Sequence, residues 1–87
     1  MNAIEKIKKA ISEDKLLIGE NSTKRALKSG KALMVVISNN TPPTTAKELE
    51  SLCKIGKAEF VKSEKDNVEL GVTCRKPFSV SVLSIKK

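Results

Sequence analysis

The fold is decided by the stretch Ala32-Leu33-Met34-Val35-Val36-Ile37-Ser38-Asn39-Asn40-Thr41-Pro42-Pro43. Its first half is an unbroken apolar run rich in branched side chains, which predicts a strand buried on both faces of a sheet. Its second half cannot continue a strand or a helix, because proline lacks an amide donor and asparagine favours turns. We therefore expect a buried strand that ends in a polar loop.

Working back from this strand, two elements are predicted near the N-terminus. Ile4, Ile7 and Ile11 recur at helical spacing with charged residues between them, which predicts an amphipathic helix that ends by residues 12–14. The short apolar run over residues 16–18 predicts a strand that stops at a glycine.

A second helix is predicted between that glycine and the buried strand. Asn21-Ser22-Thr23 supplies side-chain oxygens suited to a helix N-cap, and Gly30 is a natural residue to follow the helix end. The order strand, glycine turn, helix, strand is therefore expected over residues 16–37.

Downstream of the polar loop the sequence predicts four more elements. They are a helix that opens with a capping box at Thr45 and Glu48 and closes at Gly56, an edge strand over 58–61, a short helix capped by Asn67, and a last strand over 78–85. Alternating strands and helices imply an α/β fold, specifically a three-layer α/β/α sandwich with a small mixed sheet. Residues 1–87 show no repeat or linker, so a single domain is expected.

Charge points to a polyanionic partner. The chain carries 17 Lys and Arg against 10 Asp and Glu, a net charge of +7. Residues 1–31 hold eight basic and four acidic side chains, residues 32–70 five and six, and residues 71–87 four and none. If the turn near residue 19 and residues 71–78 lie at one end of the sheet, one face becomes cationic. The alternative is an evenly basic, solvated surface.

Composition excludes several kinds of chemistry. Histidine, tryptophan and tyrosine are absent and only two phenylalanines occur, which excludes a histidine-dependent triad, an HExxH zinc site and a cage of many rings. Cys53 and Cys74 are too far apart for a CxxC pair and are expected to be reduced core residues. We expect no catalytic residue, no metal and no cofactor, so an enzyme is the least favoured function.

The same sequence predicts a reducing compartment and no membrane contact. The N-terminus lacks the apolar stretch of a signal peptide, and the longest apolar run is far too short to span a bilayer. A cytoplasmic location is therefore expected.

The first candidate site is the start of the second helix. Residues 19–25 combine unpaired backbone N–H groups, the short polar side chains of Asn21 and Ser22, and the cations Lys24 and Arg25. A helix N-terminus suits phosphate, and asparagine can donate to and accept from a base edge. The alternative is an ordinary helix cap.

Two further candidates follow the later elements. In Arg75-Lys76-Pro77-Phe78 a ring beside two cations could stack on an unpaired base, the alternative being that Phe78 is a core residue at the start of a strand. Asn39 and Asn40 follow the buried strand, where they are either ligand contacts or plain turn residues.

Taken together, these motifs carry a family resemblance. Gly19-x-Asn21-Ser22-Thr23, Asn40-Thr41-Pro42, Glu69-Leu70-Gly71, Lys76-Pro77-Phe78 and Val80-Ser81-Val82 occur in order over nearly the whole chain. The sequence resembles the family of ribosomal protein thirty of the large subunit, in the version shared by archaea and eukaryotes, within the superfamily of kink-turn RNA binders. The resemblance implies an α/β/α sandwich that binds an RNA internal loop with tandem sheared G·A pairs.

The resemblance also assigns roles. Gly19 would allow close approach of the backbone to RNA, Asn21 and Ser22 would read purine edges, Arg25 would reach phosphate or base, and Phe78 would stack on an extruded base. Asn40 matches the asparagine that reaches RNA from the second loop. Many relatives have lysine in place of Asn21 and glycine in place of Arg75, so a non-glycine residue at 75 is strained if its φ is positive. Ser22 in place of glutamate favours the ribosomal branch.

The sequence thus predicts a constituent of the large ribosomal subunit that binds ribosomal RNA at a kink-turn, contacts other ribosomal proteins and is monomeric outside the ribosome. The alternatives are a stand-alone kink-turn protein of a small ribonucleoprotein particle and a basic scaffold module for acidic partners. The predicted RNA-binding residues are Gly19, Asn21, Ser22, Lys24, Arg25, Lys28, Asn40, Arg75, Lys76 and Phe78.

Overall fold

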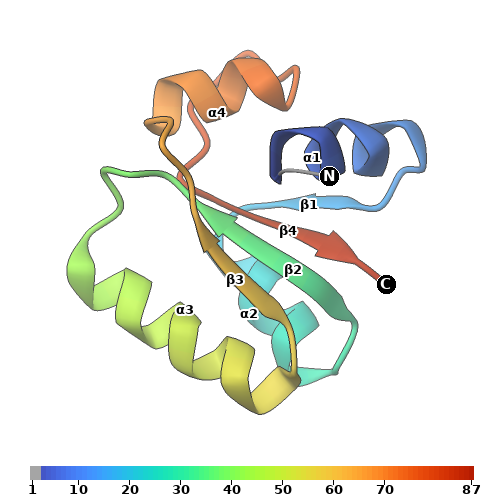
Figure 1. Cartoon of the computed structure of the whole chain (residues 1–87), viewed down its shortest axis with the longest axis vertical. Helices are drawn as coiled ribbons and strands as arrows, with labels where there is room; N and C mark the ends of the chain where they lie inside the picture. The colour runs from blue at the N-terminus through green and yellow to red at the C-terminus, as the bar shows by residue number, and fades with distance from the viewer. Residues whose placement is uncertain (1–2) are drawn as a thin grey trace.

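Helices and strands alternate along the chain in the computed structural model, which describes residues 3–87 (Figure 1). The elements are α1 (Ala3–Ser12), β1 (Leu16–Ile18), α2 (Glu20–Lys28), β2 (Ala32–Ile37), α3 (Pro43–Gly56), β3 (Glu59–Lys62), α4 (Asn67–Thr73) and β4 (Val82–Lys86). The predicted order of elements is confirmed.

The four strands form one mixed sheet in the order β1-β4-β2-β3. Strand β4 runs antiparallel to both β1 and β2, whereas β3 runs parallel to β2. The apolar run therefore occupies a central strand, and β3 is an edge strand, as the sequence predicts.

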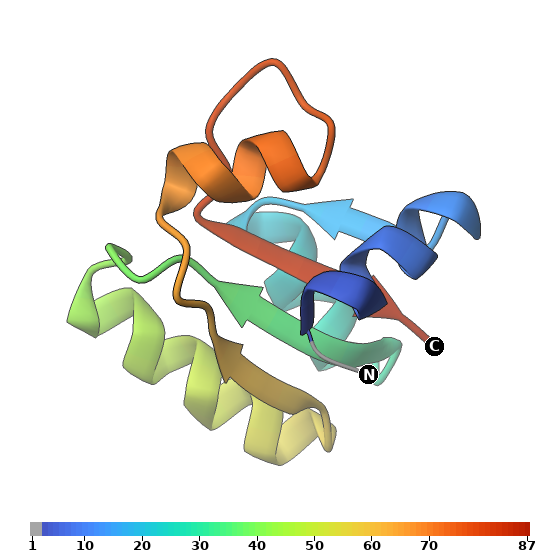
Figure 2. The ribbon, with the colours of Figure 1, turned by 45° about the horizontal axis from the view of Figure 1, so that its top comes forward.

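Helices cover both faces of this sheet, and Figures 1 and 2 show α3 and α4 on opposite sides of it. Met34 and Val36 pack with residues of α1 and α4, while Val35 and Ile37 pack with residues of α2 and α3. The alternation follows from the period of two in a strand. The three-layer sandwich is confirmed, with one apolar core on each face of the sheet.

Leu33 is the exception in the buried run. Its side chain is 53% exposed, at a register irregularity between Ala32 and Met34 in the pairing of β2 with β4. The prediction that the whole run is buried on both faces is wrong at this position, because the irregularity turns one side chain out of the core.

The predicted helix starts are the main error. Helix α2 begins directly after Gly19 with no side-chain cap, so Asn21-Ser22-Thr23 lies inside the helix. Helix α3 begins at Pro43, also with no side-chain cap, which leaves Thr45 inside it. Each helix starts earlier than predicted because the residue before it, Gly19 or Pro42, has a non-helical backbone conformation and the next residue already begins the first turn.

The remaining shifts are smaller. The cap of α4 is Asp66 rather than Asn67, with a reciprocal capping box between Asp66 and Glu69. Strand β3 lies one residue later than predicted, and the last strand begins at Val82, since residues 78–81 are occupied by other contacts described below. Gly30, by contrast, has a positive φ of 72° and follows α2 as predicted.

Both cysteines are free and buried, as predicted. Burial, together with the nearby Glu50 carboxylate, raises the pKa of the Cys53 thiol to about 11. Burial also raises the pKa of Cys74, although the positive charge of Lys76 opposes the shift. Both thiols are therefore protonated at neutral pH and poorly suited to nucleophilic attack.

The described residues also bear on membrane and metal binding. No helix within residues 3–87 is long and apolar enough to cross a bilayer. In the same part of the chain, no group of three or more His, Cys, Asp or Glu side chains could hold a metal ion.

Gly56 provides a test of the packing between α2 and α3. A β-carbon at this position would lie 2.8 Å from the backbone carbonyl oxygen of Leu27, so the two helices approach too closely for any other residue. We expect Gly56→Ala to lower the free energy of unfolding by about 1–3 kcal/mol in urea denaturation, despite the higher helix propensity of alanine.

The matched control is Ser51→Ala, at an exposed position of the same helix. This change should leave stability unchanged or raise it by about 0.5 kcal/mol. A Gly56→Ala protein as stable as the Ser51→Ala protein would contradict the close approach of the two helices.

Candidate functional site

Three loops meet at the end of the sheet where β2 finishes and β4 begins (Figure 1). The amide of Gly19 donates to the carbonyl of Val82 over 2.9 Å, and the amide of Ser38 donates to the carbonyl of Ser81 over 2.8 Å. The amide of Val80 donates to the carbonyl of Asn67 over 2.9 Å. Segment 78–82 therefore holds the start of α2, the loop after β2 and the start of α4 together.

A shallow pocket of about 350 Å³ opens among these loops. It brings Gly19 and Phe78 together, so the turn near residue 19 and residues 71–78 do lie at one end of the sheet, although none of the residues that line the pocket is basic. The other lining residues are Ile18, Glu20, Thr41, Pro42, Thr45, Ser79, Val80, Ser81 and Val82.

The backbone at Gly19 has φ 103° and ψ 158°. This conformation is essentially restricted to glycine, because a β-carbon would clash with the backbone of its own residue. No other atom lies within 4 Å of the place that such a β-carbon would take, so the turn is open on its outer side. The open turn and the free amides of the first turn of α2 together form a surface that backbone or phosphate oxygens of a ligand can approach.

Phe78 projects from a segment that is held tightly against α4. A β-carbon on the buried Gly71 would overlap the carbonyl oxygen of Phe78, so only glycine permits this approach. Phe78 as a whole is 54% exposed. The alternative that Phe78 is a core residue is wrong, and Phe60 on β3 is the ring that packs against the core on the side of α2 and α3.

The loop after β2 is fixed by long-range hydrogen bonds. The side chain of Asn40 donates to the side-chain oxygen of Asn67 over 2.9 Å and accepts from the Asn67 amide over 3.2 Å. Asn39 donates through its side chain to the carbonyl of Glu64 and through its amide to that of Lys65. The side-chain amide of Asn40 keeps one N–H and one lone pair for a ligand.

The polar residues of α2 do not all face the same way. Asn21, Arg25 and Lys28 are exposed and lie at i, i+4 and i+7, so they share one stripe of the helix opposite its buried face. Ser22 is half-buried and lies on a flank of the helix. A flat ligand surface that contacts the stripe of Asn21, Arg25 and Lys28 therefore contacts Ser22 less closely.

Lys24 is engaged within the protein. Its ammonium group lies 2.8 Å from a carboxylate oxygen of Glu48 on α3 and 3.7 Å from one of Glu20. The hydrogen bond to Glu48 raises the pKa of Lys24, and the nearby negative charges of both carboxylates act in the same direction. The charge of Lys24 is thus already compensated, unlike that of Arg25.

Arg75 and Lys76 lie at the end of α4. The amide of Arg75 donates to the carbonyl of Val72 and that of Lys76 to the carbonyl of Gly71, each over 3.0 Å, which completes a Schellman motif. Arg75 occupies the left-handed position of this motif with φ 59°, so the expectation of strain at a non-glycine residue is met. Lys76 borders a small pocket that Ile11 of α1 and Asp14 also line.

Sequence reasoning missed the polar residues that join the loops. The hydroxyl of Thr41 lies 2.8 Å from that of Ser38 and donates to the carbonyl of Ser81 over 3.2 Å. Asn67 was predicted only as a cap, although it holds Asn40. Each pairing links residues of different loops, and local sequence contains no signal for it beyond the presence of Ser, Thr and Asn.

Comparison with known proteins adds a family and a fold. A model of the ribosomal protein L7Ae/L30e/S12e/Gadd45 family matches residues 1–87. The chain is 39% identical to large ribosomal subunit protein eL30 of Neurospora crassa over 80 residues, which cover 92% of this chain and 73% of that protein. It is 33% identical to eL30 of Methanosphaera stadtmanae over 81 residues, 93% of this chain and 83% of that protein.

Among solved structures, the chain is similar to a 15.5 kD RNA binding protein of Giardia lamblia. The TM-score is 0.85 at 24% identity, with 97% of this chain and 70% of that chain covered. This likeness shows a shared fold.

The positive φ of Arg75 allows a test of the α4 cap. Arg75→Gly should raise the free energy of unfolding by about 0.5–1 kcal/mol, because glycine adopts the left-handed conformation without strain and this gain exceeds the extra entropy of the unfolded chain. Thermal or urea unfolding measures the change.

Arg75→Ala serves as the control, since it removes the same cation and keeps a β-carbon at a positive φ. It should be no more stable than the parent protein. Equal stability of the glycine and alanine variants would show that the cap carries no strain.

Proposed function

The chain belongs to the ribosomal protein L7Ae/L30e/S12e/Gadd45 family, and we propose that it is a structural constituent of the large ribosomal subunit that binds ribosomal RNA at a kink-turn. The names of its relatives support the ribosomal part of the proposal. The observation that carries the RNA part is the exposed ring of Phe78 beside the open turn at Gly19, at the junction of three loops.

The site is suited to a bent internal loop rather than to a regular duplex. The Gly19 turn and the first turn of α2 present backbone donors, while Phe78 offers a face on which one extruded base stacks. Asn21 and Ser22 supply short polar groups for purine edges, and Asn40 does the same from the second loop. Tandem sheared G·A pairs expose such edges, which is why shape and edge contacts together select this RNA.

Charge then supplies the affinity that does not depend on sequence. Arg25 and Lys28 on the exposed stripe of α2, with Arg75 and Lys76 at the end of α4, are exposed cations that can neutralise phosphates. Lys24 contributes less, because Glu48 and Glu20 already compensate it. Lys24 is therefore expected to contribute less to RNA affinity than Arg25 and Lys28, although all three are basic.

No catalytic role, metal or cofactor is part of this proposal. The only thiols are buried with raised pKa values, and the chain has no histidine to activate them. In the ribosome we infer contacts with other ribosomal proteins and a cytoplasmic location, with a monomer outside the ribosome.

A gel-shift titration tests the proposal. The probe is an internal-loop RNA with tandem G·A pairs, compared with its fully paired version at several salt concentrations. We expect at least about tenfold tighter binding of the internal-loop RNA, equivalent to about 1.4 kcal/mol. Equal affinity for both RNAs at every salt concentration would refute kink-turn recognition and favour a basic scaffold.

Copurification with large subunits, rather than with small ribonucleoprotein particles, tests the ribosomal assignment.

Two variants separate stacking from charge. Phe78→Ala should weaken binding of the internal-loop RNA by about 1–3 kcal/mol with little change in salt dependence, because stacking releases no counterion. Lys76→Ala should reduce the slope of log affinity against log salt by about one unit.

Ile55→Ala is the control for Phe78→Ala, since Ile55 is an exposed apolar residue, 79% accessible, on α3. It should bind both RNAs as the parent does. A Phe78→Ala protein that loses affinity equally for internal-loop and fully paired RNA would refute the stacking role.

A further inference from the structure

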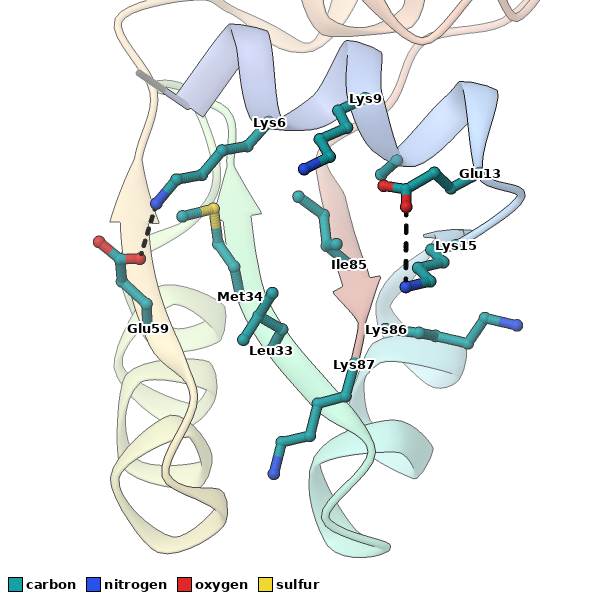
Figure 3. Close-up of a pocket in the computed structure, with 11 residues that line it drawn as sticks. Lys6, Lys9, Glu13, Lys15, Leu33, Met34, Glu59, Ile85, Lys86 and Lys87 are labelled. Carbon is teal, nitrogen blue, oxygen red and sulfur yellow. Dashed lines mark hydrogen bonds and ion pairs between the residues drawn. The ribbon is translucent and has the colours of Figure 1, made fainter. Parts of the chain in front are cut away.

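A second groove lies between α1 and the opposite end of the sheet, where β2 begins and β4 finishes (Figure 3). We call it the α1 groove; its volume is about 330 Å³. It is lined by Lys6, Lys9, Ala10, Glu13, Lys15, Leu33, Met34, Glu59, Ile85, Lys86 and Lys87. None of these residues belongs to the proposed RNA-binding site.

The floor of the α1 groove is apolar. Ala10, Met34 and Ile85 are members of the core between the sheet and α1 with α4, and they form the base of the groove. Leu33 lies beside them and is 53% exposed, because the irregularity at the start of β2 turns it outwards. The aliphatic side chain of Leu33 is thus exposed to solvent beside the apolar floor, where a ligand can cover it.

The rim of the α1 groove is cationic. Two of its lysines are paired: Lys6 with Glu59 at 3.5 Å and Lys15 with Glu13 at 3.9 Å, as the dashed lines in Figure 3 mark. Lys9 reaches over the apolar floor in the same view.

The remaining rim charges have no internal partner. Among residues 3–87, Lys9, Lys86 and Lys87 form no ion pair with a carboxylate. The groove therefore has three lysines without an ion-pair partner: Lys9 reaches over the floor, and Lys86 and Lys87 extend away from the floor at the open end of the rim (Figure 3).

We propose that the α1 groove binds an acidic protein segment that carries an aliphatic anchor residue. The anchor covers Leu33 and the adjoining floor, and flanking carboxylates pair with Lys9, Lys86 and Lys87. Charge complementarity selects an anion, and the apolar floor selects one with an aliphatic side chain. A nucleic-acid backbone offers phosphates without such a group.

The α1 groove lies at the opposite end of the sheet from the loops proposed to bind RNA. RNA bound at the loops and a protein segment bound at the α1 groove would therefore not compete for the same surface. The chain can then hold both at once, as a connector between RNA and an acidic protein. This inference does not rest on the proposed RNA function.

The test is a nuclear magnetic resonance titration of the full, ¹⁵N-labelled chain with a capped synthetic peptide, Asp-Glu-Leu-Leu-Glu-Asp. A second peptide has serine in place of both leucines. We expect saturable shifts of the amides of residues 9, 33, 34 and 85–87, and at least about fivefold weaker binding of the serine peptide.

Matched variants locate the contacts. Leu33→Ser should weaken binding of the leucine peptide about fivefold to tenfold, whereas Ile55→Ser, which removes another exposed aliphatic residue, should not. Lys9→Ala should weaken binding about twofold to fivefold, and Lys47→Ala on α3 should have no effect. All four positions are solvent-exposed, so the variants are expected to fold.

Three results would overturn the proposal. They are the absence of saturable shifts at the α1 groove at about 1 mM peptide, equal affinity for the leucine and serine peptides, and equal loss in the Leu33→Ser and Ile55→Ser proteins. A short RNA duplex that gives the same shifts with the same sensitivity to Leu33→Ser would assign the groove to nucleic acid instead.

Discussion

Segment 78–82 is the constraint on which the functional end of this molecule depends. It accepts a backbone hydrogen bond from the turn after β1, accepts another from the loop after β2, and donates one to the start of α4. Its fit against α4 requires a glycine at position 71. Because these contacts involve backbone atoms, they hold the segment in place and leave the Phe78 ring exposed.

This constraint explains why β4 is shorter than its sequence suggests. The alternating apolar residues from Val80 to Ile85 are typical of a strand, yet the first of them lies outside β4. The amide of Val80 bonds to Asn67 on α4 instead of to a neighbouring strand. Residues 78–81 thus connect the sheet to the loops, and β4 pairs with its neighbouring strands over fewer residues as a result.

The sequence predicted the layers and the sheet because hydrophobic periodicity is a local signal that core packing obeys. It placed β2, both buried cysteines and the glycine after α2 correctly. The helix starts were wrong because the conformation of Gly19 and of Pro42, rather than a capping side chain, delivers the chain into α2 and α3. The pairing of Asn40 with Asn67 could not be predicted, since these residues are 27 positions apart and meet only in the folded chain.

The candidate site was predictable in its residue types and less so in their roles. Residue chemistry and the family resemblance both indicated the Gly19 turn and Phe78, which the structure brings to one pocket. Residue chemistry also included Lys24, whose pairing with Glu48 depends on the approach of α3 to α2. Net charge alone could not separate the compensated lysine from the exposed stripe of Asn21, Arg25 and Lys28.

We propose that the three loops around segment 78–82 form one RNA-recognition surface. The most direct measurement is the map of amide shifts in the ¹⁵N-labelled chain on addition of an internal-loop RNA with tandem G·A pairs. We expect shifts concentrated in residues 19–28, 38–42 and 75–82, with the α1 groove unaffected. Shifts centred on residues 9, 33 and 85–87, or spread evenly over all basic residues, would contradict it.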